Sequence, residues 1–310
     1  MIRACSKKVS FTLCENLNPK MSKLRMSNMP NPLVAVCQMT STSNKDKNFE
    51  AVSHLVAEAK RRNACIAFLP EACDYLADNK ADAVSMAEPL DGITIKRYKE
   101  LALKEDMWLS LGGVHEALPD KGKTQNSHII INNKGEVVST YRKIHLFDME
   151  NKDTGVRLME SDYVQKGGEI VTPVSSPIGR IGLSICYDMR FPELSICLRN
   201  MGAQILTFPS AFTYQTGAAH WEVLLRARAI ESQCYVIAAA QVGTHNKKRV
   251  SWGHSMIIDP WGTIIAQCME KQGVAVAEID LDIIDKVRRN MPNEQHRRTD
   301  LYPAILPLKH

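Results

Sequence analysis

Two short apolar segments near the start of the chain constrain its fold more than any other feature. Residues 33–39 and 65–69 contain no charged side chain. Between them, apolar residues recur at helical spacing over residues 49–59, after a capping Asn44 and before the basic residues 60–62. Strands that are apolar on both faces need cover on both faces, so the chain is predicted to begin β-α-β with further layers packed around these strands.

The remaining sequence continues the alternation of strands and helices. Further strands are predicted at residues 107–113, 127–132, 136–142, 170–175, 180–185, 203–208, 234–242, 253–259, 262–267 and 273–279. Helices are predicted at residues 93–105, 192–202, 218–232 and 281–290. About a dozen strands are too many for one ordinary sheet. No linker divides residues 31–310, so we expect a single α/β domain in which two packed sheets lie between outer helices.

Composition and charge exclude several classes of protein. The chain of 310 residues is 45% hydrophobic and 24% charged, an ordinary globular mixture that argues against disorder, collagen and coiled coil. No window of 18 apolar residues predicts a membrane span. The net charge of +5 comes entirely from residues 1–30, with six basic residues and one acid, which leaves 33 of each sign elsewhere. A neutral body predicts no nucleic-acid partner.

Residues 1–30 have the composition of a targeting leader. They lack the apolar core of a secretory signal, but their scattered basic residues, serines and single acid are typical of a mitochondrial presequence. A tail without function is the alternative. Met21, Met26 and Met29 could each start a shorter product, so we expect one pool in the mitochondrion and one in the cytoplasm.

The cysteines and histidines predict no metal site. The nine cysteines are odd in number and form no CxxC pair, and the nine histidines form no HExxH motif. This pattern favours reduced thiols in an intracellular protein over disulfides or zinc. No GxGxxG motif follows a predicted strand, which argues against a dinucleotide. We therefore expect no cofactor.

Three predicted strands end in side chains of complementary chemistry. Glu71, Lys143 and Cys186 each follow the carboxyl end of a strand, where sites in α/β proteins collect. Cys186 also precedes a tight turn into a helix that starts at Pro192, which resembles a nucleophile elbow. Taken singly, the three could be a buried core cysteine, a solvated lysine and a loop acid. Together they predict a nucleophile, a cation and a base.

The thiol of Cys186 must be ionised in order to react as a nucleophile. A free cysteine has a pKa of about 8.5, and full ionisation at neutral pH requires a drop of roughly two units, or about 2.7 kcal/mol. An ammonium about 4 Å away supplies on the order of 4 kcal/mol at an effective dielectric constant of 20. We therefore expect Lys143 to ionise Cys186 and then to stabilise the oxyanion. Glu71 would accept the thiol proton and later activate water.

Three blocks of the sequence resemble the signature motifs of the nitrilase (carbon–nitrogen hydrolase) superfamily. They are residues 69–71 (LPE), 141–148 (YRKIHLFD) and 185–193 (ICYDMRFPE), and the resemblance extends over residues 33–302. It implies a four-layer α-β-β-α sandwich with two mixed sheets flanked by helices. It also implies Glu71 as general base, Lys143 as oxyanion stabiliser and Cys186 as nucleophile. A second glutamate of the family matches Glu160, which could otherwise be an ordinary loop carboxylate.

Residues 209–212 (PSAF), 217–222 (GAAHWE) and 226–231 (RARAIE) resemble the Nit amidase branch of this superfamily. The resemblance implies hydrolysis of deaminated glutathione, in which a keto group replaces the amino group, to 2-oxoglutarate and cysteinylglycine through a Cys thioester. Because this substrate carries two carboxylates, we expect cations in its pocket, with Arg190 as first candidate; a salt bridge to Glu193 is the alternative. Tyr187 is expected in the pocket wall.

The sequence is also compatible with other functions. An ω-amidase acting on 2-oxoglutaramate, or a nitrile or carbamoyl hydrolase, would use the same triad. A scaffold for protein–protein interaction is a third possibility, although it has no use for a reactive thiol. The resemblance also implies a homodimer or homotetramer.

Overall fold

The computed structural model describes residues 30–119, 122–152 and 155–302, and a compact unit begins at Pro32. Residues 1–29 lie outside the described residues, so the targeting leader stays a prediction. No helix in the described ranges has both the length and the apolar character needed to cross a bilayer.

The described unit contains two mixed sheets, a small ribbon and six α-helices. The larger sheet has the order β13 (Arg249–Trp252), β12 (Ala240–Asn246), β1 (Leu33–Met39), β2 (Ala64–Leu69), β3 (Trp108–Ala117), β4 (Thr124–Ile131), β5 (Val137–Arg142), with β16 (Gly273–Glu278) also paired to β1. The second sheet has the order β15 (Ile264–Gln267), β14 (Met256–Ile258), β11 (Tyr235–Ala238), β10 (Ile205–Thr207), β9 (Gly179–Gly182), β8 (Val174–Ser176). The ribbon pairs β6 (Asp148–Asn151) with β7 (Val156–Met159). The helices are α2 (Lys45–Arg61), α3 (Lys80–Ser85), α4 (Ile93–Lys104), α5 (Pro192–Asn200), α6 (Tyr214–Ser232) and α7 (Leu281–Asn290), and two 3-10 turns, η1 (Glu160–Asp162) and η2 (Cys186–Arg190), complete the list.

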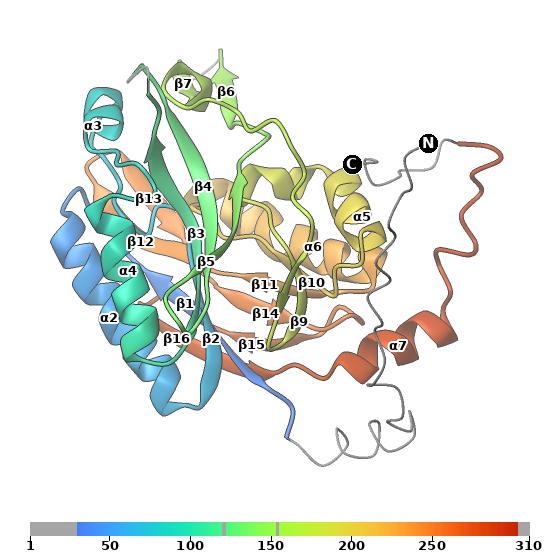
Figure 1. Ribbon diagram of the computed structural model, residues 1–310. Helices are drawn as coiled ribbons and strands as arrows, with labels where there is room; N and C mark the ends of the chain where they lie inside the picture. Colours follow the sequence, from blue (N-terminus) through green and yellow to red (C-terminus); the bar gives the residue numbers. More distant parts are fainter. Residues whose placement is uncertain (1–29, 120–121, 153–154, 303–310) are drawn as a thin grey trace, which may run out of the picture. The chain divides into compact units, whose positions relative to one another are not determined.

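Three apolar clusters separate four layers, which confirms the predicted α-β-β-α sandwich. Strand β1 alternates: Val34 and Val36 face the second sheet, whereas Ala35 and Cys37 face the cluster that includes α2 and α4. A third cluster joins the second sheet to α5 and α6 around Trp221. Figure 1 shows α2 and α4 on one side of the two sheets and α5 and α6 on the other. Because central strands such as β1, β2 and β11 are covered on both faces, they are almost entirely apolar.

The predicted single strand at residues 234–242 is wrong, because the chain changes sheets within it. Strand β11 ends at Ala238 in the second sheet, and β12 begins at Ala240 in the larger one. Both halves and the intervening Ala239 are buried, so the apolar run gives no sign of the crossing. Helix α3 and the β6–β7 ribbon were not predicted, because both are short and lack a clear apolar period.

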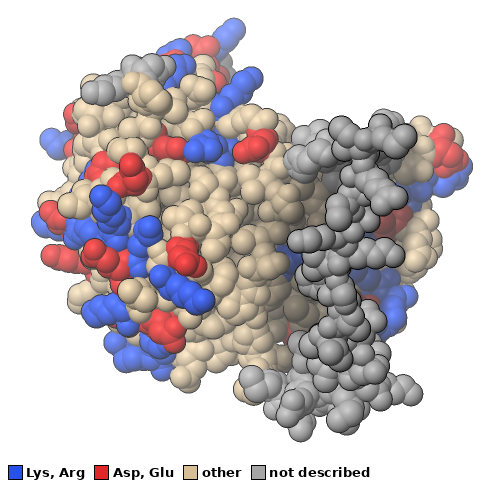
Figure 2. Space-filling model, viewed as in Figure 1, with Lys and Arg blue, Asp and Glu red and all other residues tan. Residues whose placement is uncertain are grey.

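Charged side chains on the face shown in Figure 2 alternate in sign over α2 and α4 instead of forming one basic surface. Ion pairs in this region include Arg97–Asp46 and Arg61–Glu58. This distribution agrees with the neutral body that the sequence predicts.

Candidate active site

Glu71 lies at the carboxyl end of β2 and is almost fully buried. Its Oε2 atom accepts a hydrogen bond from the backbone N–H of Ala211 at 2.9 Å, and its Oε1 atom accepts one from Nδ2 of Asn126, also at 2.9 Å. These two donors come from opposite sides of the carboxylate and fix its orientation. A buried carboxylate with its lone pairs engaged in this way is a well-positioned base.

Lys143 follows β5 and its side chain is only 2% exposed. Its Nζ atom donates to Oε1 of Glu71 at 3.0 Å and to both carboxylate oxygens of Glu160, at 3.0 and 2.9 Å. The backbone N–H of Phe147 also donates to Oε2 of Glu160, at 2.7 Å. Glu160 is therefore no ordinary loop carboxylate: it is buried and it fixes the lysine, as the resemblance implies.

Cys186 begins the tight turn η2, four residues after the end of β9. Its backbone has φ of +47°, a left-handed conformation that is uncommon for a residue with a side chain and that marks functional turns. Its N–H donates to the carbonyl of Pro209 at 2.9 Å, and its thiol hydrogen-bonds with Glu71. The predicted nucleophile elbow is present, although β9 ends at Gly182 and not at residue 185.

The charges of the three groups depend on one another. Burial acts to raise the pKa of Glu71, but the Lys143 ammonium and hydrogen bonds to Lys143 and Cys186 bring it below its usual value. Burial acts to lower the pKa of Lys143, but Glu160 and Glu71 hold it well above the ordinary range. At neutral pH Glu71 is therefore an ionised carboxylate and Lys143 an ammonium.

The expectation that Lys143 ionises Cys186 is wrong for the unliganded site. Burial raises the pKa of the Cys186 thiol first, the negative charge of Glu71 raises it further, and the opposing effect of Lys143 is smaller. A lone ammonium beside the sulfur would favour its ionisation, but here two carboxylates neutralise that ammonium. Cys186 rests as a neutral thiol beside an ionised Glu71, so its proton must leave during the reaction.

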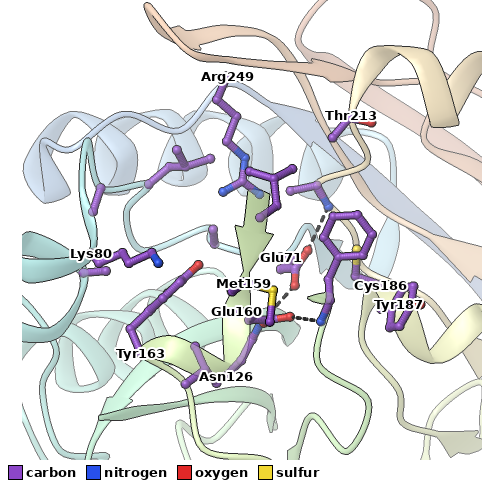
Figure 3. Close-up of a pocket in the computed structure, with 18 of the residues that line it drawn as sticks. Glu71, Lys80, Asn126, Met159, Glu160, Tyr163, Cys186, Tyr187, Thr213 and Arg249 are labelled. Atoms are coloured by element: carbon purple, nitrogen blue, oxygen red, sulfur yellow. Dashed lines mark hydrogen bonds between the residues drawn. The ribbon is translucent and has the colours of Figure 1, made fainter. Parts of the chain in front are cut away.

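These groups lie in a cavity of about 530 Å³ (Figure 3). Six cationic residues line it, against three acidic ones. The cationic residues are Lys80, Lys143, Arg157, Arg190, Lys248 and Arg249, and the acidic ones are Glu71, Asp78 and Glu160. The excess of positive charge suits an anionic ligand. Within the described ranges, no group of His, Cys, Asp and Glu side chains is arranged to hold a metal ion.

A protein-family model described as carbon–nitrogen hydrolase matches residues 33–289. The chain belongs to the carbon–nitrogen hydrolase family. Deaminated glutathione amidase from Rattus norvegicus is 53% identical to this hydrolase over 300 residues, which make up 96% of this chain and 91% of that protein.

Solved structures agree with the family. The C. elegans NitFhit protein has a TM-score of 0.86 and 49% identity to this hydrolase, over 91% of this chain and 68% of that one. Nit3 from Saccharomyces cerevisiae, a member of branch 10 of the nitrilase superfamily, has a TM-score of 0.77 and 28% identity, over 87% and 97% of the two chains. These similarities identify the chain as a hydrolytic amidase of the nitrilase superfamily.

The hydrolase places both predicted substrate-binding residues at the cavity. Tyr187 lies edge-on to Phe147, with ring centroids 5.1 Å apart. Both terminal nitrogens of Arg190 lie 3.3 Å from Nδ1 of His220, and its guanidinium lies 5.8 Å from the ring centroid of Tyr187. The alternative pairing is wrong, since no ion pair joins Arg190 to Glu193 within the described residues.

Two residues of the site escaped the sequence analysis. Asn126, in β4, donates to Glu71 and, at 3.4 Å, to Glu160, and so links the two carboxylates. Arg249 begins β13 and its side chain points into the cavity (Figure 3). Neither carries a local sequence signal. Asn126 reaches Glu71 because β3 pairs with both β2 and β4, and Arg249 reaches the cavity because β12, which pairs with β13, also pairs with β1.

Proposed function

We propose that this amidase hydrolyses deaminated glutathione to 2-oxoglutarate and cysteinylglycine. The observation that carries the proposal is the buried group of Glu71, Lys143 and Cys186 at a cavity rich in cations. An acyl-transfer site of this kind suits an amide, and the excess positive charge suits a substrate with two carboxylates. The rat relative, which carries the name of this activity, supports the same substrate.

In the first step, Glu71 removes the thiol proton as Sγ of Cys186 bonds to the amide carbon. Glu71 is suited to this role because its carboxylate is ionised and already hydrogen-bonded to the thiol. The carbonyl π electrons move to oxygen, and Lys143 together with the backbone N–H of Tyr187 stabilises the oxyanion that forms. Delaying ionisation until attack avoids a buried thiolate in the resting enzyme.

The tetrahedral intermediate then collapses. The C–N bond breaks, Glu71 gives its proton to the departing nitrogen, and cysteinylglycine leaves with a free amine. The acyl group remains as a thioester on Cys186. Glu71 is ionised again and ready for a second proton transfer.

Water completes the cycle. Glu71 takes a proton from water as the water oxygen attacks the thioester carbon. The C–S bond then breaks, and the sulfur receives the proton from Glu71. The product is 2-oxoglutarate. Throughout, Glu160 keeps the Lys143 ammonium aimed at the reacting oxygen through its two hydrogen bonds. We assign Arg190 and Tyr187 to substrate binding.

The test compares the wild-type enzyme with Cys186→Ala on deaminated glutathione and on 2-oxoglutaramate. We expect the wild type to release cysteinylglycine from the first, and an acid quench during turnover to show Cys186 heavier by one 2-oxoglutaryl group in the intact mass. Cys186→Ala should show neither product nor adduct. Ammonia from 2-oxoglutaramate, without cleavage of deaminated glutathione, would overturn the proposal in favour of an ω-amidase.

A further inference from the structure

Arg249 is a cation of the cavity that has no partner among the described residues. Lys143 is held by two carboxylates, and Lys80 and Arg157 both pair with Asp162. The guanidinium of Arg249, by contrast, makes no ion pair and no side-chain hydrogen bond with any described residue. A half-buried guanidinium with unused donors is a ready binding group for a carboxylate.

Arg249 is also close to the catalytic groups. Figure 3 shows its side chain reaching into the cavity above Glu71, with Tyr187 beyond Cys186. Burial acts to raise the pKa of Glu71, but Lys143 and Cys186 together bring it below its usual value, and the charge of Arg249 adds to the lowering. A ligand carboxylate that pairs with Arg249 would therefore lie on the same side of the cavity as Glu71.

We propose that Arg249 binds the carboxylate of the 2-oxo acid end of the substrate, and so makes the site selective for deaminated over intact glutathione. This inference rests on the proposed function and identifies the residue that recognises the 2-oxo acid end of the substrate. Four C–C bonds separate the scissile carbon from this carboxylate, about 5 Å, whereas the glycine carboxylate lies two residues farther along the leaving group, about 7 Å away. The shorter arm suits a cation beside Glu71.

The same contact would disfavour binding of intact glutathione. The two molecules are identical at the glycine end, but intact glutathione carries an ammonium next to the carboxylate in question. That end has a net charge of about zero in glutathione and −1 once the amino group has become a keto group. Placing an ammonium beside Arg249 adds a like-charge repulsion that the keto compound avoids.

The experiment combines one enzyme substitution with two changes of the substrate, so that each loss can be assigned to one contact. Arg249→Gln and wild type are assayed on deaminated glutathione, on an analogue with a methyl ketone in place of the 2-oxo acid, and on an analogue ending in glycinamide. Arg249→Gln should lower kcat/KM on the parent by roughly 30-fold, mainly through KM. The same loss should persist with the glycinamide and vanish with the methyl ketone. Lys247→Gln, which removes an exposed charge from the same hairpin, should behave as wild type.

In the kinetic assays, two outcomes would overturn the proposal. An equal loss on all three amides would mean that Arg249 acts on Glu71 or on the fold, and a loss that vanishes only with the glycinamide would assign Arg249 to the other carboxylate. Binding to Cys186→Ala separates this inference from the proposed function. In calorimetry, adding Arg249→Gln to the Cys186→Ala variant should weaken the binding of 2-oxoglutarate but leave the affinity for 4-oxopentanoate unchanged. This result is expected whether or not the wild type cleaves any of the amides. Equal weakening of both, or of neither, contradicts the inference.

Discussion

The hydroxyl of Tyr141 donates a hydrogen bond of 2.7 Å to Oδ2 of Asp188, and this contact joins the two segments that carry Lys143 and Cys186. The same carboxylate accepts hydrogen bonds from the N–H of Ile185 at 2.8 Å and from Nδ1 of His145 at 2.8 Å. Asp188 is fully buried. It therefore fixes the cysteine turn against the end of the lysine strand.

Asp188→Asn should loosen this connection. An amide offers one acceptor oxygen where the carboxylate offers two, so at least one of the buried donors loses its partner. We expect a loss of about 2–4 kcal/mol in the free energy of unfolding, measured in urea, and a fall in kcat that exceeds the change in KM. Tyr141→Phe, which removes a single donor, should cost about 1 kcal/mol. An Asp188→Asn enzyme with wild-type stability and kcat would contradict this account.

Glu160→Gln tests whether Glu160 positions Lys143 for catalysis or only stabilises the fold. The amide keeps one acceptor for Lys143 but turns a donor group towards the ammonium, so the lysine loses its fixed orientation. We expect kcat to fall about 100-fold with little change in KM, as steady-state kinetics would show.

Glu116→Gln is the matched control for that variant. Glu116 is buried to the same extent as Glu160, but it pairs with Arg142 outside the cavity. The Glu116→Gln substitution should lower the free energy of unfolding and leave kcat near the wild-type value. Equal losses of kcat in the two variants would show that any buried carboxylate in this region has the same effect.

The sequence predicted the reacting groups because each follows a predicted strand within a recognisable block. Glu71, Lys143 and Cys186 meet as expected, and Glu160 joins them through the residues between β5 and β8. The strands themselves were predictable because burial on both faces leaves continuous apolar runs. Their sheet membership was not, since the run across Ala239 reads the same whether the chain stays in one sheet or crosses to the other.

The environment of the thiol could not be predicted from the sequence. Lys143 alone would favour a thiolate at Cys186, but the charge on the sulfur depends on burial and on every neighbour at once. Arg249 escaped for a related reason: a basic residue in a polar hairpin resembles any exposed loop cation until β12 and β13 pair and bring it over the cavity.

The neutral thiol gives a prediction about pH. Burial, followed by the charge of Glu71, raises the pKa of Cys186, so the ultraviolet absorbance of the thiolate, taken as wild type minus Cys186→Ala, should still be absent at pH values where a free cysteine is ionised. Glu71→Gln removes the negative charge that opposes ionisation, so thiolate absorbance should appear at lower pH in that variant. Thiolate absorbance in the wild type at neutral pH would restore the lysine-ionised cysteine that the sequence suggested.

Gly112→Ala should disturb the backbone segments that hold Glu71 and Cys186. A Cβ atom at residue 112 would lie 2.2 Å from the carbonyl oxygen of Leu69 and 2.1 Å from Cβ of Pro209. Leu69 leads into Glu71, and the carbonyl of Pro209 accepts the hydrogen bond from the N–H of Cys186. The overlap must push these segments apart, so we expect a loss of about 2–3 kcal/mol in the free energy of unfolding and a reduced kcat. Gly168→Ala is the control, because a Cβ there meets nothing within 4 Å. Urea unfolding and steady-state kinetics of both variants would test this, and wild-type kcat in a destabilised Gly112→Ala enzyme would show that the packing behind the site supports the fold without setting its geometry.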